Sequence, residues 1–397
     1  NKKIKTVLNL GNQPLADDLR NIRQKSSKKT QIFPINVSFC NKCILLQNDF
    51  IVNDRTLYKK NYHYLPGITK DVLKNFKFMS HKLKKMYKLN SDSVVVDIGC
   101  NDGSLLNEFK KISIPKIIGV DPTDTIKFAK KNGAKTIQNF MNLKTSIKAR
   151  KFFGKADLIT TTNVFAHTNK LKDFILGVKN LIKDEGVFVI ENHYLKDVIK
   201  KKQFDTFYHE HLRTYSLKSL VKLMKMYGFK IIDAYESKRY GGNIQAHFSL
   251  KRKINSNRSK NILLKEKKLS LHKIATYNNL QYQIDQNKRE LAEYLNKNKD
   301  KLIVAKAFPA RASILLHYFS SIKENIKYIA EQPTSLKLNK YAPGTNIKII
   351  SSSIMKKKNP DIIIVLAWHL FDVIYKKWKP TLKKTKFVKI LPKLKIC

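Results

Sequence analysis

Residues 94–106, VVVDIGCNDGSLL, constrain the fold of this chain more than any other stretch. Residues 94–97 form a short apolar run that ends in an acid, which is typical of a buried strand. A glycine-containing loop follows over 98–103, and an apolar helical stripe begins at Leu105. A strand, a glycine loop and a helix in this order open a dinucleotide-type α/β unit. The stretch therefore predicts an α/β fold with a parallel sheet.

The glycines and acids of this unit indicate what the loop can bind. Gly99 permits a sharp exit from the strand, and Gly103 lets the helix start pack closely. Asp97 ends the first strand, and Asp121 ends the next one about 20 residues beyond the glycine turn, where such folds hold ribose hydroxyls. Asn101 lies inside the loop.

The same loop argues against a polyphosphate ligand. It carries Asp102 where a lysine would be needed, and the chain has no GxxxxGK[ST] sequence. An acidic loop suits a cationic ligand with a ribose, and S-adenosylmethionine fits this description. The alternative is a structural βαβ turn that binds no ligand.

Strand and helix patterns alternate through residues 91–250. A strand from Leu158 precedes a loop with Asn163 and His167, and a later strand ends at Glu191. Because loops after parallel strands line the ligand crevice, these residues are expected to converge with Asp97 and Asp121. A lone Asn or His in a loop is otherwise a turn residue.

Residues 204–220, FDTFYHEHLRTYSLKSL, concentrate polar groups that can move protons. Tyr208, His209, Glu210 and His211 follow one another directly. Histidine has a pKa near neutrality and is a ready proton acceptor, which Glu210 could orient or make more basic. His209 and His211 also form an HxH pair, but no third metal ligand is evident nearby.

The region 1–60 predicts a small irregular module. Residues 8–19 suggest a strand, a turn and a short helix, because a Gly and a Pro stand between apolar positions. Cys40 and Cys43 have the spacing of half a zinc site, whose other half would lie in residues missing upstream. The alternative is an empty remnant.

Residues 61–255 are expected to form the central ligand-binding domain, and 256–397 a helical connector with a second, smaller α/β domain. Tyr62 and Tyr64 stand at the start of the central domain, where they either pack or reach into its cleft.

The formal charge of +49 comes from lysines spread over every segment, which resembles compositional bias rather than a binding patch. Nucleic-acid binders cluster their charge on one element, so a nucleic-acid partner is not favoured. A positive field instead favours anionic substrates such as nucleotide diphosphates. Four cysteines without a disulfide framework, no apolar run of membrane-spanning length and no visible signal peptide predict a cytoplasmic location. The oligomeric state is open.

Ordered motifs along the chain resemble the nucleotide-sugar C-methyltransferase family. They are LGNQPLADDL at 10–19, CNKC at 40–43, YHY at 62–64, DIGCNDGSLL at 97–106, NVFAHTNKL from 163, FDTFYHEH at 204–211, GGNIQAHFS from 241, PARASILLHYF from 309, YAPGTNIKI from 341 and AWHLFDVI from 367. The resemblance covers essentially the whole chain. It implies an N-terminal zinc-binding module, a central Rossmann-like domain for S-adenosylmethionine, and a second Rossmann-like domain at the C-terminus.

The resemblance also implies a reaction. The substrate would be a nucleotide-linked keto sugar, and His211 would remove the proton on the carbon beside the ketone. Tyr208 and Glu210 would position the sugar and assist the base, and Tyr62 or Tyr64 would reach the same site. The resulting enolate would take the methyl group.

Departures from the family pattern fall where the family closes over or binds the sugar nucleotide. Arg311 stands for a Lys, Asn243 for a Ser, and Trp368 is flanked by Ala and His rather than Pro and Asn. Two other readings stay open: methylation of RNA or another small molecule, and a scaffold that binds the cofactor without chemistry.

Overall fold

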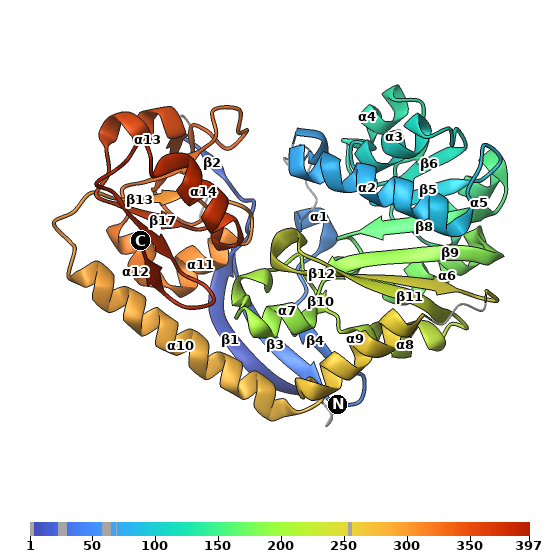
Figure 1. The fold of residues 1–397 in the computed structure, drawn as a ribbon, viewed down its shortest axis with the longest axis horizontal. Coiled ribbons are helices and arrows are strands. Elements are labelled where there is room, and N and C mark those ends of the chain that lie inside the picture. Colours follow the sequence, from blue (N-terminus) through green and yellow to red (C-terminus); the bar gives the residue numbers. More distant parts are fainter. Residues whose placement is uncertain (1–3, 23–29, 58–64, 69, 253–255) are drawn as a thin grey trace.

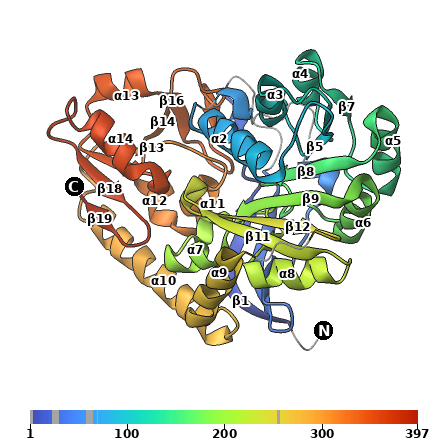
Figure 2. The same cartoon turned by 45° about the vertical axis from the view of Figure 1, so that its right-hand side comes forward.

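The computed structural model describes residues 4–22, 30–57, 65–68, 70–252 and 256–397. Two lobes face each other in Figure 1: the central domain forms one lobe and the C-terminal domain the other. Strands of the N-terminal region run along the base between them. The turned view in Figure 2 agrees with Figure 1 in placing α7 (Leu195–Lys200) and α11 (Ala312–Tyr318) where the lobes meet.

The central domain is built on a seven-stranded sheet of order β11-β12-β9-β8-β5-β6-β7. Strands β9, β8, β5, β6 and β7 are parallel, and β12 and β11 close one edge in antiparallel fashion. The strands are β5 (Val95–Ile98), β6 (Ile117–Val120), β7 (Lys135–Ile137), β8 (Ala156–Thr162), β9 (Ile182–His193), β11 (Lys230–Ser237) and β12 (Asn243–Ser249). This order confirms the predicted Rossmann-like α/β domain.

Helices cover both faces of this sheet, because alternate strand residues point to opposite sides. Val95 of β5 packs under α2 and α3, whereas Val96 joins the core under α5, α6 and α8. The helical segments are α2 (Lys70–Tyr87), α3 (Ser104–Lys111), α4 (Ile126–Lys131), α5 (Leu143–Phe153), α6 (Leu171–Leu181), α7 (Leu195–Lys200), η2 (Phe204–Thr206), α8 (Leu217–Lys225) and η3 (Arg239–Gly241), with α1 (Asp54–Leu57) and η1 (Pro66–Ile68) before them.

The C-terminal domain carries a second sheet, of order β19-β18-β17-β13-β14-β16-β15-β2, whose five middle strands from β18 to β16 are parallel. Its strands are β13 (Ile303–Lys306), β14 (Tyr328–Glu331), β15 (Lys340–Tyr341), β16 (Lys348–Ser351), β17 (Ile362–Val365), β18 (Lys386–Lys389) and β19 (Lys395–Ile396). Its helices are α11 (Ala312–Tyr318), α12 (Ser320–Asn325), α13 (Ser352–Lys358), η4 (Trp368–Leu370) and α14 (Phe371–Trp378), and α9 (Asn257–Lys268) and α10 (Ile274–Asn296) precede β13 in the chain.

The N-terminal region shares sheets with both domains. Strands β1 (Ile4–Pro14), β3 (Ile32–Cys40) and β4 (Leu45–Asn48) form an antiparallel sheet in this order, and β4 at its edge pairs with β10 (Arg213–Thr214) of the central domain. Strand β2 (Arg20–Asn21) pairs with β15. Of the strand, turn and short helix predicted for residues 8–19, the strand is confirmed, the turn comes later, at Ala16 and Asp17, and the helix was wrong. Strand β1 is continuous to Pro14, and Gly11 lies in a register shift opposite β3 instead of in a turn.

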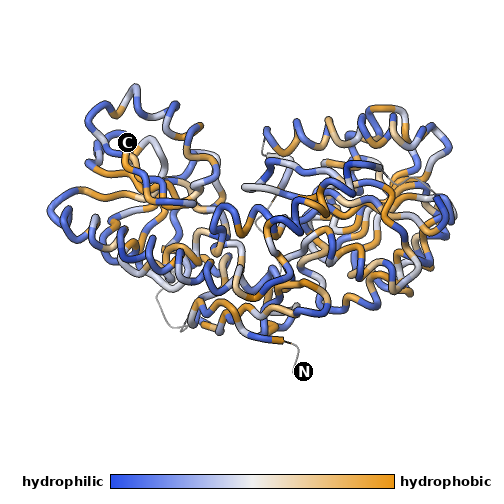
Figure 3. The backbone as a smooth tube through the Cα atoms, turned by 60° about the horizontal axis from the view of Figure 1, so that its bottom comes forward, coloured by the Kyte–Doolittle hydropathy of each residue, from blue (hydrophilic) through white to orange (hydrophobic). Residues whose placement is uncertain are grey.

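Hydrophobic stretches concentrate along the strands inside both lobes, while the helices alternate between hydrophobic and hydrophilic positions (Figure 3). This is the expected pattern for sheets buried between helical layers. Among the helices that the structure describes, none has the length and apolar character needed to cross a membrane.

Candidate functional site

The loop after β5 lies where the order of the central sheet reverses, between β5 and β8. Gly99 has φ +73°, and a Cβ there would lie 2.2 Å from Cγ2 of Val164 in the loop after β8. Gly103 has φ +76°, and a Cβ there would lie 2.6 Å from Cβ of Ala129 in α4. Both glycines are therefore required by close packing around the switch point, where α/β sheets bind their ligands.

Two of the predicted acids are fixed at this edge by hydrogen bonds. Thr160 donates to Asp97 Oδ1 at 2.7 Å, and the Asn101 amide donates to Asp121 Oδ2 at 2.9 Å. Burial, with a smaller contribution from Asp121, raises the pKa of Asp97 to about 7. Burial also raises the pKa of Asp121. Carboxyls that are costly to ionise here would be stabilised by a cation, which fits the predicted sulfonium ligand.

Asp102, the acid inside the loop, makes structural hydrogen bonds. Its Oδ2 accepts the Gly67 amide at 2.8 Å, and its Oδ1 accepts both the amide and the hydroxyl of Ser104. The carboxylate thus ties the start of α3 to η1. Tyr62 and Tyr64, predicted to act in the site, lie outside the described residues, a few positions before η1.

Glu191, Asn163 and Asn243 meet at the ends of β8, β9 and β12. Asn163 has φ +55°, and its amide donates to the Glu191 carbonyl at 2.7 Å. Asn243 donates from Nδ2 to Asn163 Oδ1 at 3.1 Å and to Glu191 Oε1 at 3.2 Å. The Glu191 carboxylate also accepts Arg239 Nη1 at 2.8 Å and Gln245 Nε2 at 3.0 Å. Glu191 therefore holds three elements together at this edge.

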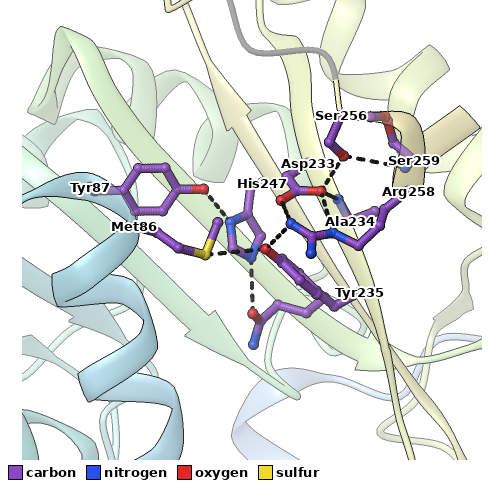
Figure 4. A network of polar contacts seen from close by, with 10 residues as sticks. Met86, Tyr87, Asp233, Ala234, Tyr235, His247, Ser256, Arg258 and Ser259 are labelled. Atoms are coloured by element: carbon purple, nitrogen blue, oxygen red, sulfur yellow. Dashed lines mark hydrogen bonds and ion pairs between the residues drawn. The ribbon is translucent and has the colours of Figure 1, made fainter.

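Gln245 of β12 links this carboxylate to a second polar network, with members on α2, β12, β11 and α9 (Figure 4). His247 donates from Nε2 to the Gln245 amide oxygen at 2.9 Å, so its Nδ1 accepts the Tyr87 hydroxyl from α2. Beside it, Arg258 of α9 and Asp233 of β11 form an ion pair at 2.7 Å. Burial lowers the pKa of His247 to about 3, so this imidazole is neutral.

His211 occupies the centre of a second cluster, in the segment between η2 and β10. Its Nδ1 lies 2.8 Å from the Thr206 carbonyl oxygen. Because a carbonyl only accepts hydrogen bonds, Nδ1 carries the proton and Nε2 carries a lone pair. The Tyr208 hydroxyl lies 2.9 Å from that Nε2 and donates to it. Burial lowers the pKa of His211 well below its usual range.

Two further imidazoles contact His211. The His167 ring lies 4.8 Å away, edge to face, and the His193 ring lies 4.7 Å away. Burial lowers the pKa of His167 to about 4 and that of His193 well below the usual range. Three neutral imidazoles from the ends of β8, β9 and the 204–211 segment therefore gather at one place, and each can donate one hydrogen bond and accept another.

Glu210 is buried near His167, with Oε2 3.9 Å from the His167 Nδ1. Burial raises the pKa of Glu210 to about 8, so the carboxyl is mostly protonated at neutral pH. His209 turns away to the Phe33 carbonyl of β3, at 3.2 Å from its Nε2. The HxH pair thus points in two directions, and the described residues contain no group of three or more His, Cys, Asp or Glu arranged to hold a metal.

Arg311 and Trp368 of the C-terminal domain reach into the central domain and meet at Asp205. Arg311 donates from Nε to Asp205 Oδ2 at 2.8 Å and from Nη2 to Oδ1 at 2.6 Å. Trp368 Nε1 donates to Oδ2 of the same carboxylate at 2.9 Å. All three side chains are buried.

Cys40 and Cys43, the predicted zinc ligands, lie at the end of β3 and in the turn after it. Burial and the neighbouring Cys40 raise the pKa of Cys43 to about 11. Two thiols supply half of a tetrahedral zinc site. The described part of the chain does not complete this site.

Sequence reasoning missed two residues of the clusters around His211. His193 stands two positions after Glu191 on β9, and the same-face period of a strand could have found it. Asp205 lies inside the FDTFYHEH motif, but its partners come from residues more than 100 positions away.

Family models match this chain in three consecutive parts. Residues 1–58 match a domain described as zinc-binding, residues 72–234 match a methyltransferase domain, and residues 238–392 match the C-methyltransferase C-terminal domain. Together these segments leave little of the chain unmatched.

A curated relative and solved structures are also similar. C-methyltransferase NovU of Streptomyces niveus is 24% identical over 368 residues, which cover 91% of this chain and 87% of the relative. An S-adenosylmethionine-dependent methyltransferase of Clostridium acetobutylicum is 16% identical, with a TM-score of 0.36 over 45% of this chain and 92% of its own. Magnesium protoporphyrin IX methyltransferase of Synechocystis is 14% identical, with a TM-score of 0.35 over 44% and 82%.

The order of the three matched domains, and the match to a C-methyltransferase along nearly the whole length of both chains, lead to one assignment: this chain belongs to the C-methyltransferase family.

Proposed function

We propose that this chain transfers the methyl group of S-adenosylmethionine to a carbon beside the ketone of a nucleotide-linked keto sugar, with His211 as the base. The family assignment supports the methyl transfer to carbon. The motif resemblance along the chain supports the sugar substrate.

One observation carries the assignment of the base. His211 holds its proton on Nδ1 against the Thr206 carbonyl, so its Nε2 lone pair is directed at the Tyr208 hydroxyl and away from the backbone. A neutral imidazole with one fixed donor and one fixed acceptor nitrogen is ready to take a proton without first losing one.

The proposed reaction consists of a proton transfer followed by a methyl transfer. Nε2 of His211 takes the proton from the carbon beside the ketone, and the C–H electron pair becomes an enolate. Tyr208 passes its hydrogen bond from Nε2 to the ketone oxygen, which gains negative charge in this step. The enolate carbon then forms a C–C bond as the methyl–sulfur bond breaks. A positioned base contributes about 10²- to 10⁴-fold to the rate.

The cofactor would bind along the loop after β5 and supply the electrophilic methyl group. Asp121 would hold the ribose hydroxyls, and Asp97 would lie near the positive charge. Gly99, Asn101 and Gly103 would line the loop, and Asn163 and His167 would border it from the end of β8. The raised pKa of the buried Asp97 supports a cationic ligand here.

The sugar nucleotide would lie on the side of the histidines that faces the C-terminal domain. Asn243, Arg311 and Trp368 are the predicted substrate-binding residues there, and Tyr62 or Tyr64 would complete the site. A formal charge of +49 favours the approach of an anionic diphosphate. Zinc is proposed for the N-terminal region only as a structural ion held in part by Cys40 and Cys43.

A methyl-transfer assay in deuterated water tests the proposal. The protein is incubated with S-adenosylmethionine and a panel of nucleotide-linked 4-keto sugars, and each sugar is examined by mass spectrometry. A methyl gain in one sugar is the expected result. Cofactor binding without methyl or deuterium gain in any sugar would contradict the proposal, and RNA-stimulated turnover with a steep salt dependence would favour an RNA substrate instead.

The variant His211→Ala tests the base in the same assay. We expect unchanged cofactor binding and a turnover lower by about 100-fold or more, because the proton acceptor is gone. His211→Ala turnover close to that of the original protein would remove His211 from this role.

A further inference from the structure

A buried ion pair joins the two Rossmann-like domains beside the proposed base. Asp205 is fully buried and Arg311 is 6% exposed. The guanidinium meets the carboxylate as a two-pronged fork, at 2.8 and 2.6 Å, and Trp368 fills a further acceptor position at 2.9 Å. Such geometry offsets the desolvation of both charges, whereas removing one partner leaves the other buried and uncompensated.

The donors come from the switch point of the C-terminal sheet. Arg311 lies in the loop after β13, and Trp368 follows β17, the adjacent strand at which the strand order reverses. Ligands of α/β sheets bind outside the carboxyl ends of strands at such a point. Here the group bound by these two loops is a carboxylate of the central domain.

Asp205 belongs to the backbone segment that contacts His211. It lies in the middle of η2 (Phe204–Thr206), and the carbonyl of the next residue, Thr206, accepts the proton of His211 Nδ1 at 2.8 Å. A bond to one ring nitrogen decides which tautomer a histidine adopts. The ion pair therefore lies one residue from the atom that decides where the lone pair of His211 is.

Arg311 also holds a second loop beside the histidines. Its Nη1 donates to the Tyr240 carbonyl at 3.0 Å, and its Nη2 donates to Gln203 Oε1 at 3.1 Å. Tyr240 has φ +49°, and its ring lies 6.0 Å from that of His193. Four of the five N–H donors of a guanidinium are thus engaged within the protein, which leaves one for any other partner.

The positive charge of Arg311 also favours the neutral form of His211. Burial is the main cause of the lowered pKa of His211, and the neighbouring His193, His167 and Arg311 lower it further. The imidazole is therefore neutral, and the tautomer rather than the charge state determines whether Nε2 can accept a proton.

We propose that Arg311, together with Trp368, is a positioning residue that holds Asp205 and the Thr206 carbonyl so that His211 keeps its proton on Nδ1 and presents Nε2 to the substrate. The proposal rests on the proposed function in one respect, that Nε2 of His211 takes the substrate proton. It gives the second Rossmann-like domain a part in proton transfer in addition to any part in binding.

Nitrogen-15 NMR of histidine-labelled protein tests the tautomer without any substrate. The His211 signals are assigned by their loss in His211→Gln. We expect the Nδ1–H tautomer in the original protein, and a shift towards the Nε2–H tautomer in Arg311→Met and in Asp205→Asn, which retains the side-chain volume. An unchanged Nδ1–H tautomer in either folded variant would overturn the proposal.

Arg258→Met is the matched control, because it removes another Arg–Asp pair, with Asp233, that involves neither residues 203–211 nor residues beyond 300. It should leave the His211 signals unchanged. Arg311→Lys keeps the charge but not the fork and serves if Arg311→Met fails to fold. We expect an intermediate tautomer mixture in Arg311→Lys, and a spectrum like that of the original protein would count against the proposal.

Kinetics separate positioning from substrate binding. A positioning role predicts that Arg311→Met lowers kcat and deuterium exchange on the order of 10²-fold, whether or not KM also rises through a lost contact with the substrate. A purely substrate-binding role predicts a raised KM with kcat retained, and this result would overturn the proposal. If no keto sugar is turned over, the proposed function fails while the tautomer measurement still decides this inference.

Discussion

At the scale of single residues, the charge states around His211 differ from what the motif alone suggests. Glu210 was predicted to orient the base or make it more basic, as a carboxylate would. Burial raises its pKa to about 8, and its Oε2 lies 3.9 Å from Nδ1 of His167. A protonated carboxyl donates a hydrogen bond, so we expect Glu210 to act as a neutral donor in the site.

This charge state predicts an alkaline limb in the pH dependence of kcat/KM. The protonated form of Glu210 prevails below about pH 8 and is lost above it, because the pKa is raised to that value. Activity should therefore fall as the pH rises through about 8. Glu210→Gln keeps a neutral donor of similar shape and should remove this limb while retaining most activity at pH 7. A limb that persists unchanged in Glu210→Gln would assign it to another group.

At the scale of elements, the regular alternation of strand and helix was predictable, but local exceptions were not. The β5 loop and α3 follow directly from the glycine pattern of residues 98–103. Residues 8–19 misled because Gly and Pro usually mark turns. Pairing with β3 keeps β1 extended to Pro14, and the positive φ of Gly11 occurs at a register shift within the strand pair. Long-range pairing, invisible in a local window, decided the outcome.

The contact between α3 and α4 predicts a specific cost at Gly103. An alanine there needs φ +76° and places Cβ 2.6 Å from Ala129 Cβ and 2.8 Å from its Cα. Gly11→Ala is the matched control, since Gly11 has φ +69° but no atom within 4 Å of its Cβ position. We expect Gly103→Ala to lower the free energy of unfolding by about 1–3 kcal/mol more than Gly11→Ala does, measured by urea denaturation. Equal losses of unfolding free energy in the two variants would show that α3 and α4 move apart at no cost.

At the scale of the whole molecule, the site is assembled from segments far apart in the chain. The concentration of proton-transferring side chains at 204–211 is visible from the residue types alone. His193 could have been found from its spacing to Glu191. Asp205 could not be assigned to the site, because its importance comes from a contact with Arg311 that only the folded chain creates. Residues that carry chemistry are visible in a sequence, whereas residues that hold them in place depend on tertiary packing.

Buried histidines predict how global stability changes with pH. Among the described residues, seven histidines have a lowered pKa, mainly through burial, so the unfolded chain binds protons below about pH 6.5 that the folded chain does not: His167, His193, His209, His211, His247, His317 and His369. In the same part of the chain, four carboxyls with raised pKa values oppose this: Asp97, Asp121, Glu210 and Glu266.

Because the seven histidines outnumber the four carboxyls by three, the free energy of unfolding should fall as the pH decreases from about 6.5 to 5, by about 4 kcal/mol per pH unit where all of these groups contribute in full. Thermal unfolding followed by circular dichroism at half-unit steps measures this slope. His247→Gln, which removes one buried imidazole, should make it shallower. A midpoint that stays constant or rises over this range would contradict the expected excess of histidine protons.

The fork between Arg311 and Asp205 has a consequence for anyone who recombines such enzymes. A chimaera that joins the central domain of this chain to the C-terminal half of a relative would replace Arg311 opposite Asp205 by the residue of that relative. It could inherit an intact cofactor loop and an intact acceptor surface and still transfer no methyl group. Residues 203–211 should therefore be exchanged together with the two loops, around 311 and 368, whose side chains bind them, and not as part of one domain alone.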